Sequence, residues 1–174
     1  MPELGSDVPF SLIRGPRLGE GRGEVLTPLE TGGTFHWVFA VADGGLSTPA
    51  VYGECDRLRA AAGADPGPGQ PSASPALLAA LRAGDAAALA ASVSHSNDLQ
   101  PAALSLRPSL AATLAAGTEA GALAALVSGS GPTTAFLVKS REDGERVAAA
   151  LAASGTCRAV RGAAGPVEGA VVVA

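Results

Sequence analysis

Residues 123–138 read LAALVSGSGPTTAFLV, in which two apolar runs flank a loop rich in glycine and serine. Short apolar runs bounded by glycine and proline are typical of β-strands, so we expect strands over 123–127 and 134–138. The helical spacing of Val147, Ala148 and Leu151 predicts an amphipathic helix over 141–154. A further strand is expected over 156–161. This order of strand, loop, strand, helix and strand predicts an α+β fold, with a small antiparallel sheet packed by helices on one face.

The segments before this region predict three further strands. FHWVFAV at 35–41 is apolar on both faces, as expected of a central, covered strand. Residues 10–29 predict two short strands around the turn-forming GEGRG at 19–23. At the other end of the chain, residues 169–173 predict a closing strand.

Helices are expected between residues 48 and 120. Thr48-Pro49 has the form of an N-cap followed by proline at the first helical position, and Pro108 can open a helix in the same way. Asn97 and Asp98 are further candidate caps. Residues 63–75 are rich in glycine, proline and serine and predict a mobile surface loop. The expected helices cover 49–61, 76–83, 86–93, 97–107 and 108–120.

Composition and charge exclude several classes of function. The 174 residues carry a net charge of −4, without the basic surface that non-specific nucleic-acid binding requires. There is no apolar run of membrane-spanning length and no signal-peptide pattern at the first residues. Cys55 and Cys157 are far apart, so we expect free thiols and no metal site. We therefore expect a cytoplasmic protein with no nucleic-acid or membrane partner, and leave its oligomeric state open.

The loop SGSGPT at 128–133 allows two interpretations. Its backbone N–H groups could bind phosphate oxygens, or the loop could be only a tight turn between two strands. A dinucleotide fingerprint would need a helix after the loop, and a Walker A loop would need Gly-Lys-Ser/Thr. Neither is present, so the residues alone leave both interpretations open.

Four other side chains carry groups capable of chemistry. Asp7 could be a general base for a hydroxyl group, or it could cap a helix or turn. Tyr52 could be a core aromatic residue or a stacking surface for a nucleobase. His36 lies in an apolar strand and is expected in the core, and His95 lies in a polar stretch and is expected in solvent.

Five segments, taken in order, resemble one family. They are GSDVPF at 5–10, GEGRGEVLTPL at 19–29, DGGLSTPAVY at 43–52, SNDL at 96–99 and SGSGPTTAFL at 128–137. Each alone is a weak match, but their order and spacing together resemble the 4-diphosphocytidyl-2-C-methyl-D-erythritol kinases of the GHMP superfamily. The resemblance covers essentially the whole chain.

The resemblance implies ATP- and Mg²⁺-dependent phosphorylation of the 2-hydroxyl of 4-diphosphocytidyl-2-C-methyl-D-erythritol, a step of the non-mevalonate isoprenoid pathway. It implies Asp7 as the catalytic base and Tyr52 as the residue that packs on the cytosine. It also implies that Gly129, Ser130 and Gly131 shape the nucleotide-phosphate side of the cleft. The implied fold is a GHMP kinase C-terminal domain over 30–174, preceded by a remnant of the N-terminal domain over 1–29.

Two motifs of the family have no match in this sequence. One carries a substrate-side lysine, and the other is the long Gly-Ser-rich loop that wraps the triphosphate; no GGGSS-like run occurs. We therefore expect an incomplete portion of the kinase with little or no activity alone. The alternatives are a non-catalytic binding module of the same fold or another GHMP kinase. Asp7 argues against homoserine kinases, and the STPAVY segment argues against mevalonate kinases.

Overall fold

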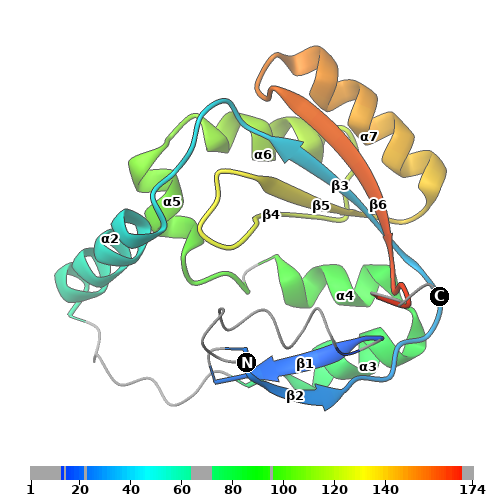
Figure 1. The fold of residues 1–174 in the computed structure, drawn as a ribbon. Helices are drawn as coiled ribbons and strands as arrows, with labels where there is room; N and C mark the ends of the chain where they lie inside the picture. Colours follow the sequence, from blue (N-terminus) through cyan, green and yellow to red (C-terminus); the bar gives the residue numbers. More distant parts are fainter. Residues whose placement is uncertain (1–12, 14, 22, 64–71, 95, 170–174) are drawn as a thin grey trace, which may run out of the picture.

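The computed structural model describes residues 13, 15–21, 23–63, 72–94 and 96–169 (Figure 1). Asp7, His95, most of the loop at 63–75 and most of the strand expected at 169–173 lie outside these residues. The strands are β1 (Arg17–Glu20), β2 (Val25–Pro28), β3 (Phe35–Val41), β4 (Ala124–Val127), β5 (Thr134–Val138) and β6 (Ala159–Gly165). The helices are α2 (Thr48–Ala61), α3 (Pro75–Ala83), α4 (Ala86–Val93), α5 (Gln100–Leu106), α6 (Leu110–Glu119) and α7 (Arg141–Ser154).

Strands β4, β5, β3 and β6 form an antiparallel sheet in that order. The expected central position of β3 is confirmed, because Val38 pairs with Phe136 of β5 on one side and with Gly162 of β6 on the other. β6 begins three residues later than expected. The predicted hairpin also forms, but β1 and β2 make a separate two-stranded sheet.

Helices pack on both faces of the larger sheet, so the prediction of one covered face is wrong (Figure 1). On one face, Val38, Phe136 and Val138 are fully buried with Val147 and Leu151 of α7. On the other face, Phe35 and Leu137 lie in a cluster with Ala80 of α3 and Leu89 of α4. The reason is the pattern of β3, whose alternate side chains are apolar on both faces and must both be removed from water.

The helix ends follow local capping rules. Ser140 accepts a hydrogen bond from the Asp143 N–H at the start of α7, and Gly155 ends the helix in the left-handed conformation. Asp85 caps α4 through the N–H groups of Ala87 and Ala88. α5 and α6 start later than expected, at Gln100 and Leu110, because turns precede them.

Thr48 does not cap α2, contrary to the prediction. It is the first residue of the helix, and Ser47 occupies the N-cap position without a side-chain hydrogen bond. The Thr48 hydroxyl is consequently free to contact another segment of the chain.

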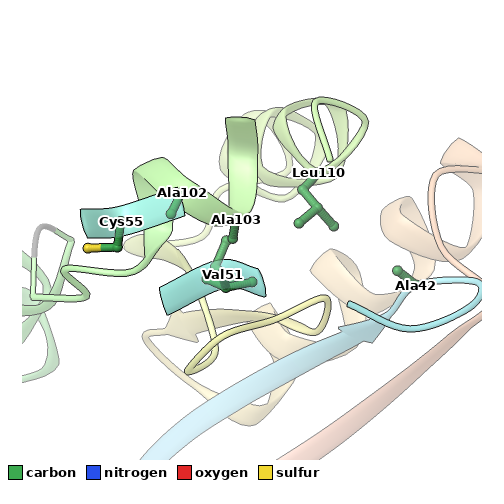
Figure 2. Packing of buried hydrophobic residues seen from close by; sticks show 7 residues of the cluster. Ala42, Val51, Cys55, Ala102, Ala103 and Leu110 are labelled. Carbon is green, nitrogen blue, oxygen red and sulfur yellow. The ribbon is translucent and has the colours of Figure 1, made fainter. Parts of the chain in front are cut away.

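Small side chains bring α2 close to α5. Figure 2 shows Val51 and Cys55 of α2 facing Ala102 and Ala103 of α5. All four are buried, and Val51, Ala102 and Ala103 are completely so. This cluster also contains Val127, the last residue of β4. The two helices are therefore fixed beside the loop that joins β4 to β5.

A second close contact joins the chain after β2 to the turn between α3 and α4. The Gly32 N–H donates to the Leu81 carbonyl at 2.8 Å. A Cβ atom on Gly32 would lie 2.2 Å from the Arg82 carbonyl oxygen, and one on Gly84 would lie 2.1 Å from the Gly32 oxygen. Neither position has room for a side chain.

The domain boundary at residue 29 stays a prediction.

Gly117→Ala should destabilise the fold although alanine favours helices. A Cβ atom at Gly117 would lie 2.2 Å from the Phe136 ring, which is fully buried. Overpacking of this kind costs about 1–3 kcal/mol. Urea unfolding monitored by circular dichroism would measure the loss.

Gly53→Ala is the matched control for that measurement. Gly53 is also inside a helix, is exposed, and would place its Cβ in open space. We expect this variant to be more stable than wild type by roughly 0.5–1 kcal/mol. Equal free energies of unfolding for the two variants would contradict the packing argument at Gly117.

Candidate functional site

The loop between β4 and β5 is a closed turn with two left-handed glycines. The Ser128 N–H donates to the Thr133 carbonyl at 2.8 Å, and the Gly131 N–H donates to the Ser128 carbonyl at 2.9 Å. Gly129 has φ 56° and Gly131 has φ 76°, while Ser130 between them has no positive φ. A Cβ atom on Gly131 would also lie 3.0 Å from Val127 Cγ1. Position 131 therefore requires glycine for both conformation and space.

The N–H groups at the tip of this loop are available to a ligand. In the part of the chain that the structure describes, neither the Gly129 N–H nor the Ser130 N–H donates a hydrogen bond. Adjacent N–H groups in a backbone that alternates between right- and left-handed conformations form concavities suited to anions. Beyond its role as a turn, the loop can thus accept phosphate or carboxylate oxygens.

Asn97 fastens the loop from outside. Its Nδ2 donates to the Val127 carbonyl at 2.7 Å and to the Gly129 carbonyl at 2.8 Å. Its Oδ1 accepts from the Leu99 N–H at 3.0 Å, in the turn before α5. The predicted helix cap by Asn97 or Asp98 is wrong, because Leu99 occupies the N-cap position without a side-chain hydrogen bond. Gln100 adds a further bond, because its Oε1 accepts from the Val127 N–H at 2.7 Å. Asn97 and Gln100 therefore bind both backbone polar groups of Val127, the residue just before the loop.

Tyr52 lies in the helix that contacts the tip of the loop. The hydroxyls of Thr48 and Ser130 are hydrogen bonded at 2.9 Å. Tyr52 follows Thr48 by four residues and is on the same side of α2. Tyr52 is 56% exposed, so the interpretation as a core aromatic residue is wrong. The reason is that α2 buries the stripe containing Val51 and Cys55, which leaves Tyr52 facing solvent.

A surface hollow of about 360 Å³ adjoins the loop on the face of the larger sheet that carries α3 and α4. Trp37 and Phe39 of β3 form part of its wall, and both are half-buried. Ser128 and Gly129 form the wall at the loop, next to Asn97. His36 does not lie in the core as expected. It is half-buried in a different hollow, of about 430 Å³, beside Arg141 and Glu145 of α7.

A half-buried carboxylate, that of Glu54, links α2 to α5. Glu54 is only 11% exposed at its side chain and accepts two hydrogen bonds from Arg57, at 2.7 and 2.8 Å. The Ser105 hydroxyl of α5 donates to Glu54 at 2.6 Å. The hydrogen bonds from Arg57 and then Ser105 lower the pKa of Glu54 to about 2. The carboxylate is consequently charged at neutral pH and joins the two helices.

Gly129, Ser130 and Gly131 form the tip of one loop, and Ser130 contacts α2 at Thr48, four residues before Tyr52. Asp7 lies outside the described residues. Sequence reasoning missed the contacts of Thr48 and Gln100, and it assigned Asn97 only a cap. The signal for Asn97 was a polar residue in the SNDL segment; nothing in the sequence indicated which carbonyls it would bind.

No group of acidic, histidine or cysteine side chains that could hold a metal occurs in the described ranges. Among the same residues, no helix is long and apolar enough to cross a bilayer.

Comparison with known families agrees with this architecture. Residues 77–157 match the family model described as "GHMP kinases C terminal". Residues 77–157 thus have the sequence pattern of a GHMP kinase C-terminal domain, and the fold around them is that of such a domain. The match runs from α3 to the segment before β6 and includes Asn97, Gln100 and the loop at 128–133.

Relatives of this GHMP domain are similar over nearly the whole chain. A Streptomyces avermitilis protein named 4-diphosphocytidyl-2-C-methyl-D-erythritol kinase is 66% identical over 98% of this chain and 56% of its own length. A protein of the same name from Thermobifida fusca is 58% identical over 98% of this chain and 53% of its length. The chain thus spans about half the length of the curated relatives it matches.

Solved GHMP structures share the fold. A 4-(cytidine 5'-diphospho)-2C-methyl-D-erythritol kinase matches with TM-score 0.67 and 26% identity, over 93% of this chain and 54% of its own. The mevalonate kinase of L. major matches with TM-score 0.65 and 15% identity, over 90% of this chain and 50% of its own. The second likeness concerns the fold alone.

Glu54→Gln should change how stability depends on pH. Because the pKa of Glu54 is about 2 in the folded chain and 4.5 ordinarily, its ionised form stabilises the fold above about pH 4.5. That contribution is lost as pH falls toward 2. The variant should lack this part of the acid sensitivity, as urea unfolding between about pH 6 and 2 would show.

Glu145→Gln serves as the control, since Glu145 is 70% exposed in an ion pair with Arg141 on α7. Such exposed pairs contribute little to stability. If the stability difference between wild type and Glu54→Gln were the same at every pH, the assigned role of Glu54 would be wrong.

Proposed function

We propose that the chain forms the C-terminal part of an ATP-dependent kinase acting on the 2-hydroxyl of 4-diphosphocytidyl-2-C-methyl-D-erythritol. The observation that carries the proposal is the loop at 128–133, with two available N–H groups and with Ser130 hydrogen bonded to Thr48, about one helical turn before the exposed Tyr52. The 66% identity to a relative of that name supports the choice of substrate. In this proposal the chain alone has little or no activity.

The loop would contribute by binding and positioning. Phosphoryl transfer depends mainly on aligning the reacting groups and stabilising charge on the phosphate oxygens. The Gly129 and Ser130 N–H groups fit that task because they are fixed in direction and carry no other partner within the described chain. ATP supplies the phosphoryl group; the requirement for Mg²⁺ comes from the resemblance alone.

The other two site residues would act on the substrate. Tyr52 presents an exposed ring on which a cytosine can stack. Asp7 would accept the proton of the 2-hydroxyl, a role that follows from the GSDVPF resemblance.

A chimera would test the function. The part of the Streptomyces avermitilis relative that lies outside the match is joined to this chain, and ADP formation is measured with 4-diphosphocytidyl-2-C-methyl-D-erythritol. We expect substrate-dependent turnover in the chimera and little or none in the 174-residue chain. The reason is that the motifs without a match here would come from the added part.

Two results would contradict parts of this proposal. A folded chimera that binds Mg-ATP and the cytidine compound in calorimetry without phosphorylation would favour a non-catalytic binding module. Turnover by the 174-residue chain at the rate of the chimera would overturn its predicted inactivity.

Asp7→Asn in the chimera should abolish turnover and leave the affinity for both ligands unchanged.

Tyr52→Ala should weaken binding of the cytidine substrate to the chimera. Loss of one base-stacking contact is worth roughly 1–3 kcal/mol, or about 5- to 150-fold in affinity. Tyr52→Phe keeps the ring and should bind within about twofold of wild type. Because Tyr52 is exposed, neither variant should change thermal stability much. Unchanged substrate affinity in Tyr52→Ala would remove this residue from the site.

A further inference from the structure

Both the nitrogen and the oxygen of the Asn97 side-chain amide are hydrogen bonded to backbone groups. Two donated hydrogen bonds go to Val127 and Gly129, and one is accepted from Leu99. The two acceptors are 30 and 32 residues away along the chain, so the contact is tertiary rather than a local turn. Of the described residues, Asn97 is the one whose side chain bonds both before and within the loop.

The planarity of the peptide bond converts these contacts into a direction for the loop N–H groups. In a trans peptide, the carbonyl of one residue and the N–H of the next point in opposite directions. Since the Gly129 carbonyl points at Asn97, the Ser130 N–H must point away from Asn97. In the same way, the Ser128 carbonyl accepts from Gly131, which turns the Gly129 N–H out of the closed turn.

Asn97 can hold this direction because its own backbone is firmly placed. The Gln100 N–H donates to the Asn97 carbonyl at 3.1 Å, so the residue is joined to the start of α5. α5 in turn buries Ala102 and Ala103 completely against α2. Without a fixed donor, two left-handed glycines around Ser130 would leave the loop many alternative conformations.

We propose that Asn97 is a positioning residue that fixes the Gly129–Ser130 peptide, so that the Ser130 N–H points at a bound anion. The ligand chemistry is that of a polyphosphate chain, and its identification with ATP rests on the proposed function. Asn97 itself touches no phosphate in this scheme. It acts through the carbonyl of Gly129.

Asn97→Asp is a nearly isosteric test. The aspartate keeps the oxygen that accepts from the Leu99 N–H, but it loses the Nδ2 donor and places a carboxylate against two carbonyl oxygens. Binding of inorganic tripolyphosphate to the 174-residue chain is measured by calorimetry at about pH 7. We expect the affinity to fall about tenfold or more.

The dependence of this loss on pH separates positioning from general damage to the fold. A protonated aspartate regains one O–H donor for the Val127 or Gly129 carbonyl. The ratio of wild-type to variant affinity should therefore shrink as pH falls toward the ordinary aspartate pKa of about 3.9. A misfolded loop would show no such recovery.

Ala91→Glu is the control for the added negative charge. It lies at an exposed position of α4 and is outside the walls of the hollow beside the loop. Its tripolyphosphate affinity should stay within about twofold of wild type. Proton NMR of both variants verifies that the fold is retained.

Each outcome decides the proposal. Equal affinity of Asn97→Asp and wild type, a loss without recovery at low pH, or no tripolyphosphate binding by wild type would overturn it. In the chimera, the same variant should raise KM for ATP about tenfold and leave KM for the cytidine substrate unchanged. A folded wild-type chimera that binds both ligands without turnover would refute the proposed kinase function, while the tripolyphosphate titration would still decide the role of Asn97.

Discussion

Close contact between α2 and α5 determines the geometry of everything around the loop at 128–133. Ala102 and Ala103 allow the approach, since larger side chains at these fully buried positions would separate the helices. α2 brings Thr48 to the loop tip, and the segment leading into α5 brings Asn97 to its carbonyls. The two helices thus hold the loop from two sides. Glu54 adds a charged hydrogen-bonded link between them.

The sequence predicted the strands and α7 well because their signals are local. The continuous apolar run at 35–41, the glycine and proline breaks, and the Ser140 and Gly155 ends depend on neighbouring residues. The number of covered sheet faces was predicted wrongly. It depends on where α3 and α4 return in space, and many exchangeable alanines give little indication of that. The hairpin was foreseeable, whereas its separation from the larger sheet was not.

The candidate site was predictable as a set of residues but not as an arrangement. Resemblance pointed to Tyr52 and to Gly129, Ser130 and Gly131, and in the structure Ser130 contacts Thr48 on the helix that carries Tyr52. Periodicity alone could not tell whether Tyr52 faces the core, because α2 carries apolar and polar residues on overlapping stripes. Hydrogen bonds across 30 residues, such as that of Asn97 to Val127, arise from tertiary placement and leave no pattern in the chain.

The contact between Gly32 and Gly84 has a consequence for how this domain can vary. Backbone touches backbone there, so each glycine sets the space that is available to the other. A side chain at either position would push the same two segments apart. Once one substitution has separated them, the second substitution would reduce the free energy of unfolding by a smaller amount. The effects of the two substitutions would therefore not add. The contribution of this contact to the stability of the fold therefore depends on the two glycines together.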